Sequence, residues 1–91
     1  MEDPPFDPRQ FYRTNDMAMV TYLKMEGHTS QRCVWEAQTC YWWFRITDSL
    51  LECVEKFSDG LALIEPREYN RLFTQTKREF YDSKPAAIAA G

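Results

Sequence analysis

A single histidine and three cysteines are the residues of this 91-residue chain best suited to catalysis. His28 is of the type that serves as a general base near neutral pH, and Cys33 or Cys40 is of the type that serves as a thiol nucleophile. A structural role is the alternative, because His28 follows Gly27, and a polar residue after such a glycine often ends a helix. The chain has three glycines and no glycine-rich phosphate loop, and its acidic pairs have the spacing of solvated helix surfaces. We therefore expect no enzymatic activity and no small-molecule substrate.

The three cysteines are odd in number, and none belongs to a C-x-x-C pair. A structural zinc ion needs four ligands, and the three cysteines with His28 would be the only set available. Cys40 and Cys53 lie among apolar residues at the spacing of a protein core, where free cysteine packs as a small apolar side chain. We expect Cys33, Cys40 and Cys53 to be reduced, with no metal and no other cofactor.

Residues 40–46 carry the strongest strand signal of the chain, and their alternation separates two faces. One face is apolar and comprises Cys40, Trp42, Phe44 and Ile46. The other face aligns Tyr41, Trp43 and Arg45, which are three residue types enriched at binding hot spots. With Phe11 and Arg13 from a preceding strand, these residues form the candidate partner-binding site.

Three interpretations of this second face remain open. In the first, a C-terminal helix folds back and buries Tyr41 and Trp43 in a small second core. In the second, the face is a protein interface. In the third, Phe11 or Tyr12 joins Trp43 in a platform that stacks nucleic-acid bases, as aromatic residues on the central strands of RNA-recognition domains do. The net charge of −3 and the pI near 5.1 are unusual for a protein held by phosphate contacts. We therefore favour a protein partner.

The elements that position these residues follow from caps, stops and hydrophobic periodicity. A strand at 10–13 leads to a helix that begins at the capping run 14–16 and ends at Gly27. Strands at 32–36 and 40–46 form a hairpin, and a helix runs from 47–49 to Gly60. A short buried strand at 61–64 precedes a last helix, capped by Glu65, from Pro66 to about Asp82. This order predicts an α+β fold with a ferredoxin-like β-α-β-β-α-β antiparallel sheet and an added C-terminal helix.

Composition places a single domain at 10–82. Apolar residues make up 44% of the chain and aromatic residues 15%, enough for a packed core. Residues 1–9 hold three prolines and three acids and predict an extended arm, while 83–91 predict a flexible tail. No apolar run approaches the ~18–20 residues of a membrane span. The acidic, proline-rich start is unlike a signal peptide.

The stretch from Phe11 to Tyr81 resembles a small domain-of-unknown-function family that recurs in bacteriophage and prokaryotic genomes. The motifs that carry the resemblance are Thr14-x-Asp16, Tyr22-Leu23 before Gly27, Trp42-Trp43-Phe44, Ile64-x-Pro66 and Lys77-Arg78. The resemblance implies a phage or mobile-element setting and no established activity.

Together these observations predict a non-enzymatic module that binds a protein stoichiometrically. The partner is a copy of itself, a phage structural protein or a host protein, and the location is the host cytoplasm or the virion. Two roles fit this class: a virion accessory that binds a shell or tail, and an inhibitor of a host defence protein. The alternative is a module that binds single-stranded DNA or RNA on the same face.

Overall fold

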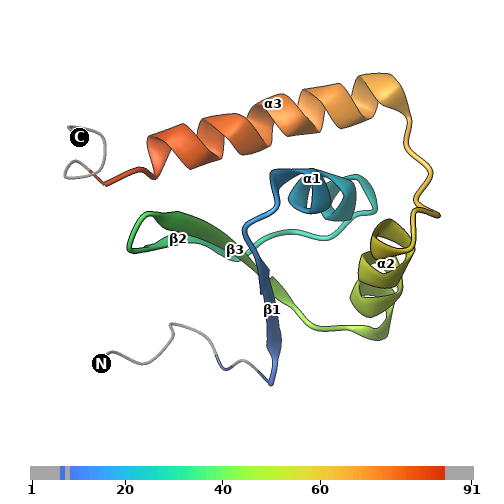
Figure 1. The fold of residues 1–91 in the computed structure, drawn as a ribbon. Helices are drawn as coiled ribbons and strands as arrows, with labels where there is room; N and C mark the ends of the chain where they lie inside the picture. The colour runs from blue at the N-terminus through green and yellow to red at the C-terminus, as the bar shows by residue number, and fades with distance from the viewer. Residues whose placement is uncertain (1–6, 8, 86–91) are drawn as a thin grey trace.

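The computed structural model describes residues 7 and 9–85, and this part of the chain contains three strands and three helices (Figure 1). In chain order they are β1 (Phe11–Thr14), α1 (Met17–Met25), β2 (Arg32–Glu36), β3 (Thr39–Arg45), α2 (Asp48–Ser58) and α3 (Pro66–Asp82). The predicted α+β class is confirmed. The predicted arm at 1–9 and tail at 83–91 lie mostly outside the described residues.

The sheet is antiparallel, with β3 between β1 and β2. The β2–β3 hairpin closes through Ala37 and Gln38, since Glu36 pairs with Thr39. Ala37 has a φ of 55°, a left-handed conformation that a tight hairpin turn requires. The sequence predicted this hairpin although its turn lacks the usual asparagine or glycine.

Local capping fixes where each helix starts. The carboxylate of Asp16 accepts hydrogen bonds from the backbone N–H groups of Ala18 and Met19 at the start of α1. Thr47 caps α2 in the same way, and Glu65 caps α3. The caps at Asp16 and Glu65 agree with the sequence prediction, and Thr47 is one of the two caps that the sequence left open for α2, the other being Ser49. Within residues 7 and 9–85, no helix combines the length and the apolar character needed to cross a membrane.

The predicted fourth strand at 61–64 is wrong. The structure has no strand at 61–64. The side chains of Leu61, Leu63 and Ile64 are 67%, 85% and 46% exposed, respectively. Gly60, with a φ of 75°, ends α2, and Pro66 begins α3 five residues after Leu61. Because α2 and α3 both pack against α1, the segment spans the gap between two anchored helices and does not pair with β1. The ferredoxin-like order is therefore incomplete.

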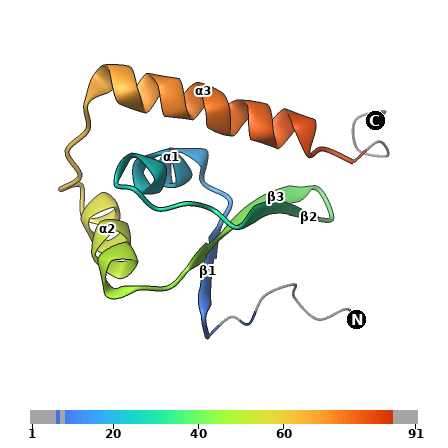
Figure 2. The ribbon, with the colours of Figure 1, turned by 180° about the vertical axis from the view of Figure 1, so that it is seen from behind.

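The core lies between the helices and one face of the sheet. Figures 1 and 2 show α1 packed beneath α3, with α2 at one end of the sheet. The side chains that are at most 1% exposed come from α1, β3, α2 and α3, and they include Val20, Leu23, Trp42, Phe44, Leu50 and Thr76. Trp42 and Phe44 belong to the apolar face that alternation predicted. The described helices thus cover this face of the sheet.

The interpretation that placed the last helix over Tyr41 and Trp43 is also wrong. The ring of Phe80 on α3 lies 5.0 Å from that of Trp35 and 6.4 Å from that of Trp42, centroid to centroid. Both tryptophans project to the core side. The apolar stripe of α3 therefore packs beside α1, on the face opposite to Tyr41.

Candidate functional site

The register of the sheet gathers the predicted binding residues on the face that the described helices leave uncovered. Phe11 pairs with Arg45, and Arg13 pairs with Trp43. Because directly opposed residues share a face, both β1 residues lie on the same side of the sheet as Tyr41. We call this surface the open face, and its described side chains are Phe11, Arg13, Val34, Glu36, Thr39, Tyr41, Trp43 and Arg45.

Arginine and aromatic side chains are stacked across the strands of the open face. The guanidinium of Arg13 lies 4.2 Å from the ring centroid of Tyr41 and 5.6 Å from that of Trp43. Its Nη1 also forms an ion pair with the Glu36 carboxylate on β2. The guanidinium of Arg45 lies 5.4 Å from the ring centroid of Phe11. Each such contact contributes about 0.5–1 kcal/mol at an exposed site, so these side chains are held in place before any partner arrives.

The residues of the open face differ in depth. Arg13 and Arg45 are exposed, and Phe11 and Tyr41 are half-buried. Trp43 is only 2% exposed and forms the floor of the face. Strand alternation predicts which face a side chain joins, but it says nothing about how deeply neighbours cover it. The surface that a partner can touch is therefore made by the arginines, Phe11, Tyr41 and the β2 side chains, and not by Trp43.

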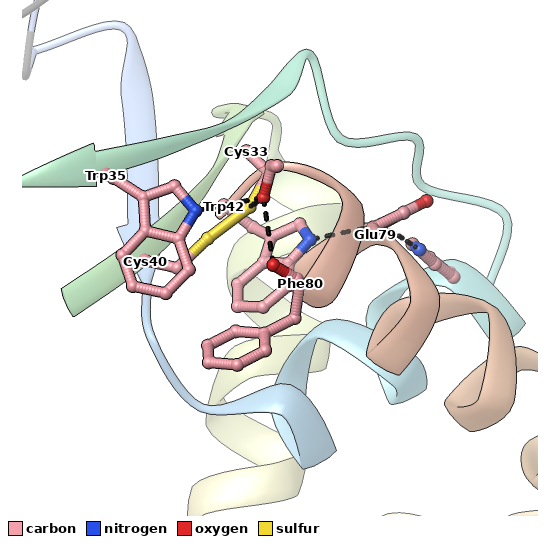
Figure 3. The surroundings of a disulfide bond; sticks show 8 residues. Cys33, Trp35, Cys40, Trp42, Glu79 and Phe80 are labelled. Atoms are coloured by element: carbon pink, nitrogen blue, oxygen red, sulfur yellow. Dashed lines mark hydrogen bonds and ion pairs between the residues drawn. A yellow bond between two sulfur atoms is a disulfide. The ribbon is translucent and has the colours of Figure 1, made fainter. Parts of the chain in front are cut away.

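The opposite face contains a polar network that the sequence did not reveal. Glu79 on α3 accepts hydrogen bonds from Lys24 Nζ at 2.7 Å and from Trp42 Nε1 at 3.1 Å (Figure 3). Lys24 also donates to Thr76 Oγ1 at 3.2 Å, and Trp35 Nε1 donates to Ser83 Oγ at 3.0 Å. The available signal was helical spacing, which puts Glu79 three residues after the inward-facing Thr76.

Cys33 and Cys40 are joined in a disulfide, so the prediction that all cysteines are reduced is wrong for this pair (Figure 3). Cys33 pairs in register with Trp42, and Cys40 pairs with Trp35, which places the cysteines diagonally across β2 and β3 on the core side. Their Cα atoms are 6.4 Å apart, within the usual range for a disulfide. Only the strand register brings the two residues together. Cys53 is free and buried, in agreement with the prediction.

His28 lies beside Cys53, and not beside the two cysteines proposed as nucleophiles. Its Nε2 is 3.8 Å from Cys53 Sγ and 3.4 Å from Ser49 Oγ. Burial, and then the negative charge of Glu26, raises the pKa of Cys53, so its sulfur is a neutral thiol at neutral pH. A neutral, buried thiol is a poor nucleophile. In the described part of the chain, no group of three His, Cys, Asp or Glu side chains is placed to hold a metal ion.

Comparison with known proteins gives a family and no activity. No curated protein and no solved structure matches the chain. A family model described as Domain of unknown function (DUF5659) matches residues 9–82. The match runs from just before β1 to the end of α3 and agrees with the resemblance predicted for residues 11–81. The chain therefore belongs to the DUF5659 family of domains of unknown function.

Proposed function

We propose that this domain is a non-enzymatic module that binds a partner protein through its open face. The observation that carries the proposal is the placement of the described helices on the other side of the sheet, which leaves Tyr41, Arg13 and Arg45 accessible. Tyrosine and arginine are among the residues that contribute most to binding free energy at protein interfaces.

The stacking of the open face supports this role. Long side chains lose conformational entropy when a partner immobilises them, by about 0.5–1.5 kcal/mol each. Arg13 is already held by Tyr41 and Glu36, and Arg45 is already held against Phe11. Binding therefore costs less ordering than it would on a surface of free arginines.

The biological setting is a further part of the proposal, and its support is the resemblance carried by the sequence motifs. In a phage or mobile element, the module acts in stoichiometric amounts as a virion accessory on a shell or tail, or as an inhibitor of a host defence protein. It works in the host cytoplasm or in the virion, and its partner is itself, a phage structural protein or a host protein.

Binding of single-stranded DNA or RNA is the second candidate. The observation in its favour is that Phe11 on β1 and Tyr41 on the adjacent β3 present aromatic rings on one sheet face, beside arginines. Against it, the Glu36 carboxylate pairs with Arg13 within the same face, and the net charge is −3. We therefore rank it below protein binding.

Photo-crosslinking from the open face tests the proposal. Tyr41 is replaced by the photo-reactive analogue benzoylphenylalanine, and Tyr81, which is 64% exposed on α3, is replaced in a matched control. After irradiation in cells that produce the protein, we expect protein adducts from position 41 and not from position 81. Equal adducts from both positions would contradict the proposal. Fluorescence anisotropy with labelled single-stranded oligonucleotides tests the alternative, which requires binding that weakens steeply with salt.

A further inference from the structure

We propose that the Cys33–Cys40 disulfide is a thiol-exchange site at which small-molecule thiols attach to Cys33 and release Cys40. The bond crosslinks β2 to β3 on the core side of the hairpin, beside the C-terminal end of α3 (Figure 3). It lies on the face opposite to Tyr41, so the proposal does not depend on the proposed binding function.

The two cysteines of the disulfide differ in their exposure to solvent. Cys40 is 3% exposed and belongs to the apolar core with Trp42 and Phe44. Cys33 is half-buried and lines a cavity of about 470 Å³. The other lining residues are Ser30, Gln31, Glu79, Asp82 and Ser83. A thiolate must reach the sulfur that it attacks, and the cavity gives such a path to Cys33.

A hydroxyl group lies close to the sulfur of Cys33. Ser83 Oγ lies 3.3 Å from Cys33 Sγ. A disulfide sulfur has no proton and a serine hydroxyl has only one, and the Ser83 hydroxyl donates it to the carbonyl oxygen of Phe80 at 3.2 Å. The indole N–H of Trp35 donates to Ser83 Oγ at 3.0 Å and fixes its position. The incoming thiolate therefore meets Cys33 beside a hydroxyl group that Trp35 and Phe80 hold in place.

The exchange step balances without an oxidant or a reductant other than the thiol. A small-molecule thiolate forms a new S–S bond with Cys33 Sγ, and the Cys33–Cys40 bond breaks. Its electron pair leaves on Cys40 as a thiolate, which takes a proton from water. The apolar surroundings of Cys40 make this thiolate a poor leaving group, so we expect slow exchange, on the minutes-to-hours scale of uncatalysed disulfide rearrangement.

The group attached to Cys33 occupies the cavity beside Asp82 and Ser83, where the end of α3 meets β2. The contact between Trp35 and Ser83 is therefore the first one that the adduct disturbs.

Two single-cysteine replacements allow the reactivity of each sulfur to be measured separately. The Cys40→Ala variant keeps a thiol at Cys33, and Cys33→Ala keeps one at Cys40; neither can close the disulfide again. Each folded variant, checked by circular dichroism, is treated with 2-hydroxyethyl disulfide, and the adduct is followed by intact mass and peptide mapping. We expect Cys33 to react about tenfold faster or more, since a buried thiol reacts only when the chain opens locally. Equal rates, or faster reaction at Cys40, would overturn the proposal.

The unmodified chain supplies a test that does not depend on the folding of a variant. Alkylation in denaturant without reductant is expected to label Cys53 alone, and labelling of all three cysteines would refute the disulfide. After reduction and brief native treatment with iodoacetamide, peptide mapping is expected to find Cys33 labelled before Cys40. The reverse order would overturn the assignment of Cys33 as the accessible sulfur.

Discussion

The ammonium of Lys24 on α1 lies 2.7 Å from Oε1 of Glu79 on α3, and the Lys24 side chain is only 10% exposed. The same carboxylate oxygen accepts the indole N–H of Trp42 from β3. One acidic residue thus joins two helices to the central strand of the sheet. Since a mostly buried ammonium without a partner is costly, this contact is a point at which the packing of α3 can be tested.

Replacing Glu79 should destabilise the domain. Glu79→Ala leaves the Trp42 N–H without its acceptor and the Lys24 ammonium without its counter-charge, and we expect the free energy of unfolding to fall by about 2–3 kcal/mol. Glu79→Gln keeps an oxygen acceptor and should cost less. The measurement is urea unfolding followed by circular dichroism. Glu68→Gln is the control, because its partner Arg71 is exposed, and its cost should be much smaller because solvent screens an exposed ion pair. A similar cost for the Glu79→Ala and Glu68→Gln variants would contradict this account.

Reduction of the Cys33–Cys40 disulfide should also lower stability. The two cysteines are seven residues apart in sequence, and a closed loop of that length contributes roughly 2.5 kcal/mol in the chain-entropy model. We expect a phosphine reductant to shift the urea midpoint of the wild-type chain downward. The Cys33→Ala/Cys40→Ala double variant is the control and should not respond to the reductant. An unchanged wild-type midpoint would argue against the bond.

The parts of the fold that the sequence predicted are those with local determinants. The caps at Asp16, Thr47 and Glu65 act within one helical turn, and the alternation along β3 needs no knowledge of its neighbours. Composition and spacing therefore sufficed to place each helix start within a few residues and to predict the β1 and β3 residues of the open face, but not Val34 and Glu36 on β2.

The parts that were missed depend on residues distant in sequence. The Cys33–Cys40 bond follows from the β2–β3 register, and the depth of Trp43 follows from what covers it. The Leu-Ala-Leu-Ile run at 61–64 has the composition of a buried strand, but its ends are tied to helices that pack on α1. No local pattern reports such a constraint.

The exposure of residues 61–64 can be tested by comparing one of their side chains with a core residue. Leu63 is 85% exposed, whereas Leu50 on α2 is fully buried. We expect Leu63→Ala to change the free energy of unfolding by less than about 0.5 kcal/mol. Leu50→Ala, which leaves a cavity in the core, should cost about 3 kcal/mol. Urea unfolding of both variants checks this. A cost above about 2 kcal/mol for Leu63→Ala would instead indicate that Leu63 is buried, as the predicted strand at 61–64 required.

Alkaline pH should destabilise the domain through the buried phenol of Tyr22 and the half-buried phenol of Tyr69. Burial first, and then the charge of Glu26, raises the pKa of Tyr22 above its ordinary value of 10.0. Burial and Asp16 raise the pKa of Tyr69 in the same direction. Because the folded chain holds these protons more tightly than the unfolded chain, their stabilising contribution is complete below pH 10. It is lost as the pH rises from that value through the folded-state pKa.

Tyr22→Phe isolates one part of this effect, since it keeps the buried ring and removes the titrating hydroxyl. We expect its free energy of unfolding to decline less steeply above pH 10 than that of the wild-type chain. The pKa values of Tyr69 and Cys53 are also raised, so the free energy of unfolding of this variant should still decline somewhat as the pH rises. Tyr81→Phe, at a position 64% exposed, is the matched control and should keep the wild-type slope. Urea unfolding at stepped pH measures all three chains. Parallel curves for wild type and Tyr22→Phe would show that the Tyr22 hydroxyl titrates alike in the folded and unfolded states.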